Sequence, residues 1–192
     1  LPTKPEQSDL YIAMYGRHGE APMPVLCATS STNCFDMTIE AARIALKYMT
    51  PVILLTDGYL AQGSEPWRIP DIEKIPSFNV EFATDPTNYA PYNRNPETLA
   101  RMWAIPGTPG MEHRIGGLEK ENGSGLVSHD PMNHQKMCEI RAKKIDNIAF
   151  DIPEVTIDGP ESGDLLVISW GSTHGAIKKA LPKLREEGYE VS

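Results

Sequence analysis

Three short loops of the sequence hold side chains that could do chemistry. In the first loop, Arg17, His18 and Glu20 follow one another closely, and the glycines Gly16 and Gly19 flank them. A guanidinium, an imidazole and a carboxylate in one loop can bind an anion or move a proton, and connecting segments often carry function. The alternative is a connecting loop that binds nothing.

The second loop begins at Asp57, just after an apolar run that ends at Leu55. The carboxyl ends of parallel strands are where open α/β sheets bind their ligands, so Asp57 is a candidate ligand-binding residue. The structural alternative is that Asp57 and Gly58 only turn the chain. Both interpretations remain open from the residues alone.

The third loop holds His113 and Arg114 in a glycine-rich segment, and a further loop holds His129 and His134. Such cations and imidazoles could meet an anionic substrate or a metal. Solvated or interface loops are the favoured interpretation, because histidine is common at surfaces without any ligand. We therefore assign no metal ligand to this sequence.

A weaker candidate is the segment 171–175, where Ser172 and Thr173 precede a predicted helix. Free amides at a helix N-terminus can hold a phosphate or a carboxylate. The segment lacks the lysine of a P-loop and the glycine spacing of a dinucleotide fingerprint. An ordinary helix cap is therefore favoured over an anion site.

The clearest elements form a strand, helix, strand unit. An apolar run at 24–28 predicts a strand, and Asn33 is the predicted cap of a helix that ends at Thr50 and Pro51. The helix carries an apolar stripe at helical spacing, and residues 52–55 form a second apolar run. This order predicts a parallel β-α-β unit. The stripe comprises Phe35, Ile39, Ala42, Leu46 and Met49.

Residues 62–130 predict mostly loop, because proline, glycine, asparagine and aspartate interrupt nearly every apolar run. One short strand is predicted at 78–82. A helix is predicted from Asn133 towards Phe150, with an apolar face that includes Met137 and Ile148.

The last forty residues begin a second α/β pattern. They predict a buried strand at 164–170, a helix that ends at Gly188, and another strand from Tyr189. Pro182 lies inside that helix and predicts a kink or a local break. One β-α unit cannot cover both faces of a parallel sheet, and the chain starts without Met. We therefore expect both ends to be internal to a longer protein.

Composition excludes several classes of function. The formal net charge is −8 and the isoelectric point is about 5.1, which disfavours nucleic acid and anionic membranes as partners. No apolar run approaches the roughly 20 residues that span a bilayer, and a cytoplasmic location is expected. Cys27, Cys34 and Cys138 are widely spaced and predict free thiols, not a cluster site.

The residues resemble a known family, the α subunits of 2-oxoacid:ferredoxin oxidoreductases, and most closely the 2-oxoglutarate type. The similarity covers nearly the whole chain. It is carried by residues 1–10, Gly16-Arg17-His18-Gly19-Glu20, residues 34–36, 55–61, 65–67 and 103–119, and Trp170-Gly171-Ser172-Thr173-His174-Gly175.

This resemblance implies an enzyme that decarboxylates a 2-oxoacid on thiamine diphosphate, joins the acyl group to coenzyme A and passes electrons to ferredoxin. In such enzymes the α subunit holds the aminopyrimidine half of the cofactor. The β subunit, the implied partner, supplies the sites for the diphosphate, Mg²⁺ and an iron–sulfur cluster. No cofactor is expected to bind this fragment alone.

The fold implied is a parallel-sheet α/β, three-layer αβα, pyrimidine-binding domain. Residues 1–152 resemble its later half with long connecting loops, and residues 153–192 resemble the start of a transketolase-C-terminal-like domain. The family's catalytic Glu and a substrate-binding Arg lie upstream of Leu1, so no catalytic residue is assigned here. The loops with Arg17, Asp57 to Tyr59, and His113 are expected to face the cofactor, the substrate channel or the β subunit.

Two alternatives remain open from the sequence. A pyruvate or branched-chain 2-oxoacid enzyme of the same family has the same motifs. A non-catalytic nucleotide-binding, anion-binding or assembly module, which uses the helix start at Ser172, belongs to a different class.

Overall fold

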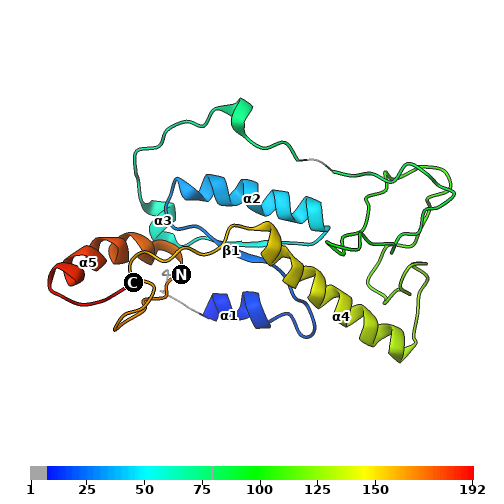
Figure 1. Cartoon of the computed structure of the whole chain (residues 1–192). Helices are drawn as coiled ribbons and strands as arrows, with labels where there is room; N and C mark the ends of the chain where they lie inside the picture. Colours follow the sequence, from blue (N-terminus) through cyan, green and yellow to red (C-terminus); the bar gives the residue numbers. More distant parts are fainter. Residues whose placement is uncertain (1–7, 79) are drawn as a thin grey trace, which may run out of the picture.

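The computed structural model describes residues 8–78 and 80–192. The segment 1–7 of the family resemblance and Asn79 of the predicted strand lie outside these described residues. The described elements follow in the order shown in Figure 1, from α1 near the N-terminus to α5 near the C-terminus. No helix in the described part of the chain is long and apolar enough to cross a membrane.

The predicted β-α-β unit is confirmed. Strand β1 (Val25–Cys27) pairs in parallel with β2 (Ile53–Leu55), and Leu26 lies opposite Leu54. Helix α2 (Asn33–Tyr48) connects the two strands, and Figure 1 draws α2 and α1 on opposite sides of the pair. The parallel-sheet α/β fold is therefore confirmed, with two strands in the sheet of the described residues.

The predicted cap of α2 was wrong in its detail. Asn33 is the first helical residue, and its side-chain oxygen accepts hydrogen bonds from the Thr29 amide at 3.1 Å and hydroxyl at 3.2 Å. The Ser30 hydroxyl instead accepts from the Asn33 amide at 3.2 Å. The side chains of Ser30 and Asn33 both order the turn after β1. Hydrogen bonds within this turn therefore fix the start of the helix, and no single residue caps it.

The main apolar core lies where α2 meets the end of α4. Helix α4 (Pro131–Asn147) and the short 3₁₀ helix η2 (Ile148–Asp151) confirm the helix predicted near 133–150. Ile44, Tyr48 and Ile148 form a buried cluster, and Leu26 and Val52 pack against it. This cluster joins α4 to the β-α-β unit.

An ion-pair network lies beside this core. Asp151 accepts from Arg43 and from Lys47, both at 2.7 Å, and Glu40 pairs with Arg43 at 2.6 Å. Burial by itself would raise the pKa of Asp151, but the hydrogen bonds from Lys47 and Arg43 lower it. The network fixes η2 against the outer face of α2.

Helix α1 (Ser8–Tyr15) was not predicted from the sequence. Only Ala13 of this helix is buried, whereas Tyr11 and Tyr15 are exposed. A helix of this length with so little buried surface has a weak apolar periodicity, which explains why the pattern did not reveal it.

The long middle segment is mostly loop, as predicted, with the single-turn helices α3 (Gly58–Gln62) and η1 (Ile72–Lys74). The strand predicted at 78–82 was wrong within the described residues: only an isolated bridge joins Phe82 to Trp103. The Trp103 indole donates instead to the Leu46 carbonyl at 3.0 Å, so this loop is fixed onto α2.

The strand predicted at 164–170 was also wrong. Leu165 forms only an isolated parallel bridge with Val191, and Leu166 and Ile168 are exposed. The two backbone segments do exchange hydrogen bonds, for example from Ser192 to the Leu165 carbonyl at 3.1 Å. The apolar run has no further strand beside it among the described residues, so it does not form a regular ladder.

The helix predicted after this segment is confirmed. The 3₁₀ turn η3 (Gly171–Thr173) leads into α5 (His174–Glu186), and Gly188 follows with a φ of 95°. Helix α5 continues through Pro182, so the predicted local break is not present in this helix. Pro182 has no amide proton and cannot donate a hydrogen bond to the preceding turn. Leu181 is the buried residue of this helix.

Candidate functional site

The candidate site lies at the carboxyl edge of β1 and β2, where the two connecting loops meet. The turn after β1 presents the hydroxyls of Ser30, Ser31 and Thr32, and Asp57 follows β2. Ser31 donates to the Leu60 carbonyl at 2.8 Å, which ties the first loop to α3. This is the edge at which parallel sheets present polar groups to a ligand.

Asp57 is the central charged residue of this edge. Its carboxylate caps α3 by accepting from the Leu60 amide at 3.0 Å, and it accepts from the Ser172 amide at 3.2 Å. The Ser172 hydroxyl is the main cause that lowers the pKa of Asp57, and the backbone amides of Leu60 and Ser172 add to the effect. Asp57 therefore joins two segments that are 115 residues apart.

Gly171 allows this approach. It is buried with a φ of 71°, a backbone conformation that glycine adopts more easily than other residues. The neighbouring thiol of Cys27, at the end of β1, has its pKa raised by burial, and the Gly171 backbone partly offsets this. The segment before α5 thus packs over the ends of both strands.

The Ser172 and Thr173 candidates have partners within the chain. The Ser172 amide is bonded to Asp57, and the Thr173 hydroxyl donates to the Trp170 carbonyl at 2.9 Å. An external anion would have to replace the Asp57 carboxylate at the Ser172 amide. The start of this helix therefore already has an anionic partner, the Asp57 carboxylate.

Glu65 is a residue of this edge that sequence reasoning did not single out beyond its family motif. Its carboxylate accepts from the Thr32 amide, and this bond is the first cause that lowers the pKa of Glu65. The sequence signal for Glu65 is its place two residues before Trp67, whose ring packs at a tilt against Phe35. Glu65 holds the segment after α3 against the start of α2.

The Arg17 loop lies elsewhere, at the C-terminal end of α1. Arg17 and His18 both have positive φ angles, of 72° and 57°. The Arg17 guanidinium donates to the carbonyls of Ile12, Ala13 and Ala21, so it caps α1 and closes its own loop. Its Nε is buried and has no hydrogen-bond partner among residues 8–78 and 80–192, whereas His18 and Glu20 are exposed.

The His113 loop belongs to the long middle segment. The His113 Nδ1 lies 2.9 Å from the Met111 carbonyl and 3.3 Å from the Tyr89 hydroxyl, and its ring packs on Tyr89. Arg114 is exposed, and so is Tyr59 on α3. Of the sequence candidates, the structure thus brings together Asp57 and Ser172, and the hydrogen bonds of Arg17 and His113 are to other parts of the chain.

Comparison with known proteins identifies the family to which the chain belongs. The family described as "Pyruvate flavodoxin/ferredoxin oxidoreductase, thiamine diP-bdg" matches residues 1–130 of the chain. The chain belongs to this family. Its α/β unit is therefore part of a thiamine-diphosphate-binding domain of the pyruvate flavodoxin/ferredoxin oxidoreductase family.

Relatives within the family are subunits of 2-oxoacid oxidoreductases. The 2-oxoglutarate oxidoreductase subunit KorA of Mycobacterium tuberculosis is 51% identical over 193 residues, which cover 100% of this chain and 29% of the relative. The 2-oxoglutarate synthase subunit KorA of Archaeoglobus fulgidus is 29% identical over 98% of this chain and 46% of the relative. The expected resemblance to α subunits of the 2-oxoglutarate type is confirmed.

A solved structure shares the fold. It is a 2-oxoglutarate:ferredoxin oxidoreductase from Magnetococcus marinus with 2-oxoglutarate, coenzyme A and succinyl-CoA bound, and it is 32% identical with a TM-score of 0.83. The match covers 97% of this chain and 32% of that chain. The chain therefore spans about a third of the length of that protein.

The two carboxylates of this edge already have hydrogen-bond partners within the chain. Asp57 accepts from the Leu60 and Ser172 amides, and Glu65 accepts from the Thr32 amide. The Ser30 and Thr32 hydroxyls lie 3.1 Å apart and contact each other. These contacts make Asp57 and Glu65 structural residues of this edge, which hold its connecting segments together.

Proposed function

We propose that this chain is part of the α subunit of a thiamine-diphosphate-dependent 2-oxoacid:ferredoxin oxidoreductase. The reaction proposed converts 2-oxoglutarate and coenzyme A to succinyl-CoA, CO₂ and reduced ferredoxin. The observation that carries this proposal is the 51% identity to a 2-oxoglutarate oxidoreductase subunit over the whole chain. Further support is the similarity to a structure that binds 2-oxoglutarate and coenzyme A.

The cofactors and partners follow from this proposal. The complete enzyme would hold thiamine diphosphate with Mg²⁺ and an iron–sulfur cluster, mainly through a β subunit, and would reduce ferredoxin in the cytoplasm. The three free cysteines of the described residues lie on β1, α2 and α4. Because they are spread over three elements, they support the placement of a cluster on another chain.

When bound in the complete enzyme, thiamine diphosphate would supply the chemistry of 2-oxoacid decarboxylation. The part of this chain is to hold the elements that surround that group. Asp57 fixes α3 and the segment before α5 over the ends of β1 and β2. Precise positioning of this kind matters, because small displacements near reacting groups cost large factors in rate.

The exposed residues of the three candidate loops are proposed to face the cofactor, the substrate channel or the β subunit. Support comes from His18, Glu20, Tyr59 and Arg114, which all lie on the surface of the described chain. The proposal also keeps the domain boundary near residue 152, where η2 ends and an extended segment begins.

The function is tested with the complete α subunit assembled with its β subunit. We expect ferredoxin reduction that requires both 2-oxoglutarate and coenzyme A, with succinyl-CoA as the product. Omission of coenzyme A is the internal control, since it removes the acyl acceptor and leaves every other component in place. Reduction that proceeds equally well without a 2-oxoacid would contradict the proposal.

A pyruvate or branched-chain 2-oxoacid enzyme is the second candidate within the family, and the name of the matched family includes pyruvate. The anion-binding module is less well supported, because Asp57 already accepts from the Ser172 amide. Calorimetry with AMP, coenzyme A and thiamine diphosphate separates a module, which would bind a nucleotide tightly, from a part of an enzyme, which would bind none.

A further inference from the structure

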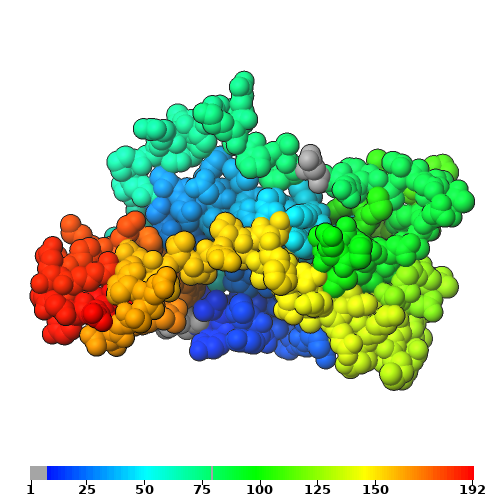
Figure 2. All heavy atoms as spheres, in the orientation of Figure 1, coloured from blue at the N-terminus to red at the C-terminus, as the bar shows by residue number. Residues whose placement is uncertain are grey.

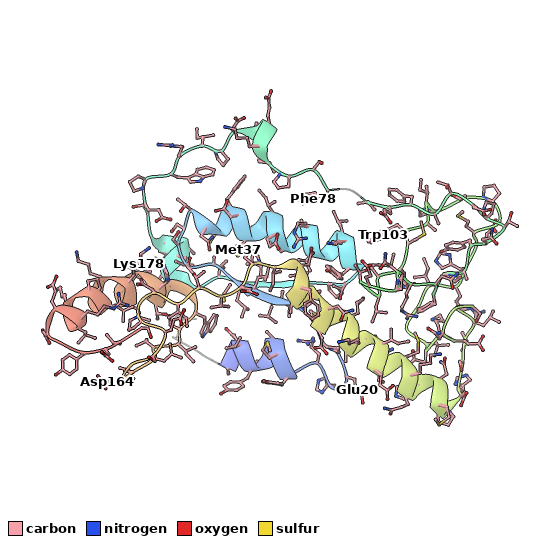
Figure 3. All side chains as sticks on the ribbon, in the orientation of Figure 1. Glu20, Met37, Phe78, Trp103, Asp164 and Lys178 are labelled. Carbon is pink, nitrogen blue, oxygen red and sulfur yellow. The ribbon has the colours of Figure 1, made fainter. Side chains whose placement is uncertain are left out.

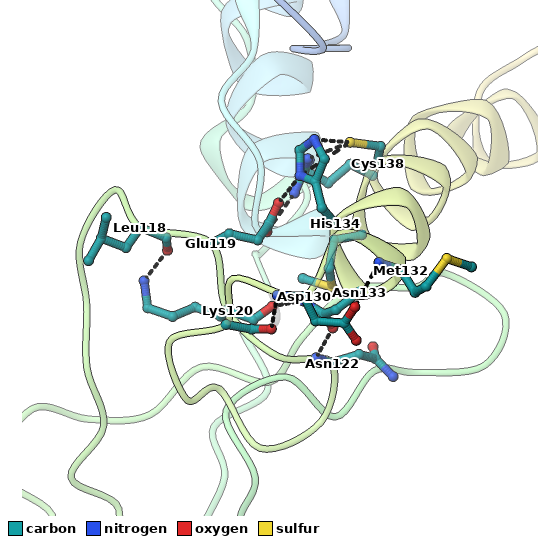
Figure 4. Close-up of polar contacts among 12 residues, drawn as sticks. Leu118, Glu119, Lys120, Asn122, Asp130, Met132, Asn133, His134 and Cys138 are labelled. Atoms are coloured by element: carbon teal, nitrogen blue, oxygen red, sulfur yellow. Dashed lines mark hydrogen bonds and ion pairs between the residues drawn. The ribbon is translucent and has the colours of Figure 1, made fainter.

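A second cluster of functional groups lies on α4, away from the carboxyl edge. Glu20, His134 and Cys138 each place one ligand atom within 4.8 Å of the others. His134 and Cys138 come from α4, and Glu20 comes from the loop that follows α1 (Figures 3 and 4). We call these three residues the α4 cluster. Segments more than 100 residues apart in the sequence thus meet at one point.

The spacing on the helix suits a metal. His134 and Cys138 are four residues apart and therefore lie on the same face of α4. The His134 Nε2 lies 3.7 Å from the Cys138 Sγ. Bond lengths of about 2.3 Å to sulfur and 2.0–2.1 Å to nitrogen place tetrahedral zinc ligands roughly 3.6 Å apart. The other ring nitrogen, Nδ1, lies 4.0 Å from the same sulfur, so the imidazole would turn its Nε2 lone pair towards Cys138 on binding a shared zinc ion.

The residues around the cluster orient His134. Glu119 accepts from the His134 Nδ1 at 2.8 Å, which places the proton on Nδ1 and leaves Nε2 as the nitrogen that can bind a metal (Figure 4). A carboxylate that holds the far nitrogen of a histidine is the usual outer partner of a zinc-binding imidazole. This contact is an observation independent of the three ligand positions.

The charges are also balanced. A thiolate at Cys138 and the Glu20 carboxylate would together neutralise a divalent ion, while Glu119 pairs with Arg141 at 3.2 Å. Arg141 also donates to the Cys138 Sγ at 3.2 Å, so the guanidinium and a metal would share this sulfur. Without a metal, the same contacts would be a surface hydrogen-bond network.

We propose that the α4 cluster binds a zinc-class divalent ion through the Glu20 carboxylate, the His134 Nε2 and the Cys138 Sγ. Water completes the fourth position, as in zinc sites with three protein ligands. Glu20 is exposed, so its carboxylate can close the remaining distance by a rotamer change. The ion would fasten the loop of Arg17 and His18 to α4, and Glu20 would then not face the cofactor. This proposal does not depend on the proposed function.

The test is the zinc content of the assembled enzyme after equilibration with micromolar zinc and removal of excess metal. X-ray absorption at the zinc edge selects zinc even where iron is present. We expect about one zinc per α subunit, with one sulfur neighbour at about 2.3 Å and the others at 2.0–2.1 Å. Zinc that is absent, or that has only oxygen neighbours, would overturn the proposal.

Variants assign the signal to the α4 cluster. Cys138→Ser and His134→Ala should each lose the bound zinc, whereas Cys34→Ser, which removes a thiol on α2, should retain it. If either α4 variant fails to assemble, Glu20→Gln on the exposed loop remains the deciding change. It should weaken zinc binding by at least about tenfold. Unchanged zinc content in all three variants of the α4 cluster would refute the assignment.

Glu119 is a positioning residue in this proposal. Glu119→Gln should lower zinc affinity by roughly 10–100-fold while the sulfur neighbour remains in the absorption spectrum. A merely structural role for Glu119 would leave zinc affinity unchanged, and that result would remove the outer partner from the proposal.

Discussion

At the scale of single residues, Asp57 is the contact through which distant segments meet. Asp57→Asn removes the charged acceptor for the Leu60 and Ser172 amides. Asparagine can still accept hydrogen bonds, but a hydrogen bond to a charged group contributes about 1.5–3 kcal/mol and one to a neutral group about 0.5–1.5 kcal/mol. Amides in 58–62 and 171–173 should therefore exchange hydrogen several-fold faster. Hydrogen exchange with mass spectrometry checks this. Asp71→Asn is the matched control, because Asp71 caps only η1, and equal acceleration by both variants would contradict the role of Asp57.

The same carboxylate gives a pH dependence. The pKa of Asp57 is lowered in the folded chain, so its contribution to stability is present above the ordinary aspartate pKa. That contribution is lost as the pH falls through the lowered pKa of the folded state. The exchange difference between the wild-type protein and Asp57→Asn should therefore disappear in strong acid, and a difference that grows there would contradict this sign.

Lys144 is a second residue whose environment sets its charge. Burial, and then repulsion from Arg101, Arg94 and Arg141, lower its pKa from 10.5 to about 8. Between about pH 8 and 10 the unfolded chain binds more protons than the folded chain, so stability should rise with pH in this window. Lys144→Met should reduce this rise in the free energy of unfolding by about 1–3 kcal/mol. Unfolding at each pH, followed by circular dichroism, measures the change.

The exposed neighbour Lys143 provides the control. Lys143→Met should keep the rise in stability between pH 8 and 10. A rise that survives in Lys144→Met, or that is lost in Lys143→Met, would show that another group titrates in this window.

Sequence reasoning at this scale found single residues but not their partners. Asp57 was predicted at a strand end, yet its bond to Ser172 depends on a fold that brings residues 115 positions apart together. His134 and Cys138 are visible in the sequence as a helical pair, whereas Glu20 joins them only through tertiary structure. Sequence spacing reveals contacts within one helix and misses contacts between segments.

At the scale of elements, the packing of α2 against η2 carries the main apolar core. Ile44 is 0% exposed and contacts the cluster with Tyr48 and Ile148. Ile44→Ala should destabilise the domain by about 2–5 kcal/mol, because it leaves a cavity. Thermal unfolding measures this loss. Ile12→Ala on α1, where the side chain is 59% exposed, should change stability by less than about 0.5 kcal/mol.

The elements that were predicted correctly share one feature of their sequences. Strands β1 and β2 and helices α2, α4 and α5 each carry an apolar pattern that their own neighbours bury. The strand predicted at 164–170 fails because strand formation needs a paired backbone, and only Leu165 forms a bridge there. Helix α1 was missed because its exposed face is as apolar as its buried one.

At the scale of the whole molecule, large apolar side chains lie on the surface between η2 and α5. Phe150, Val155 and Ile168 are 87%, 96% and 86% exposed. Several large apolar side chains exposed within one segment of the chain are typical of a surface that contacts other protein. We expect these residues to be covered in the assembled enzyme, and oxidative footprinting of the assembled enzyme against the 192-residue chain measures this. Equal labelling in both would contradict it.

We expect activity from the assembled enzyme and none from the 192-residue chain alone. The chain spans 29% of one relative and 32% of the similar solved protein. The described carboxylates of the carboxyl edge are engaged within the chain. The 192-residue chain alone should therefore neither decarboxylate 2-oxoglutarate nor reduce ferredoxin, and measurable turnover by the purified chain would refute this expectation.

The central claim is that this chain belongs to an enzyme for 2-oxoglutarate. The most direct measurement is kcat/KM of the assembled enzyme for 2-oxoglutarate and for pyruvate, under the same conditions with coenzyme A and ferredoxin. A site built for the second carboxylate should leave polar groups unpaired when pyruvate binds, and should favour 2-oxoglutarate by about 100-fold or more. Equal values, or a preference for pyruvate, would contradict the claim.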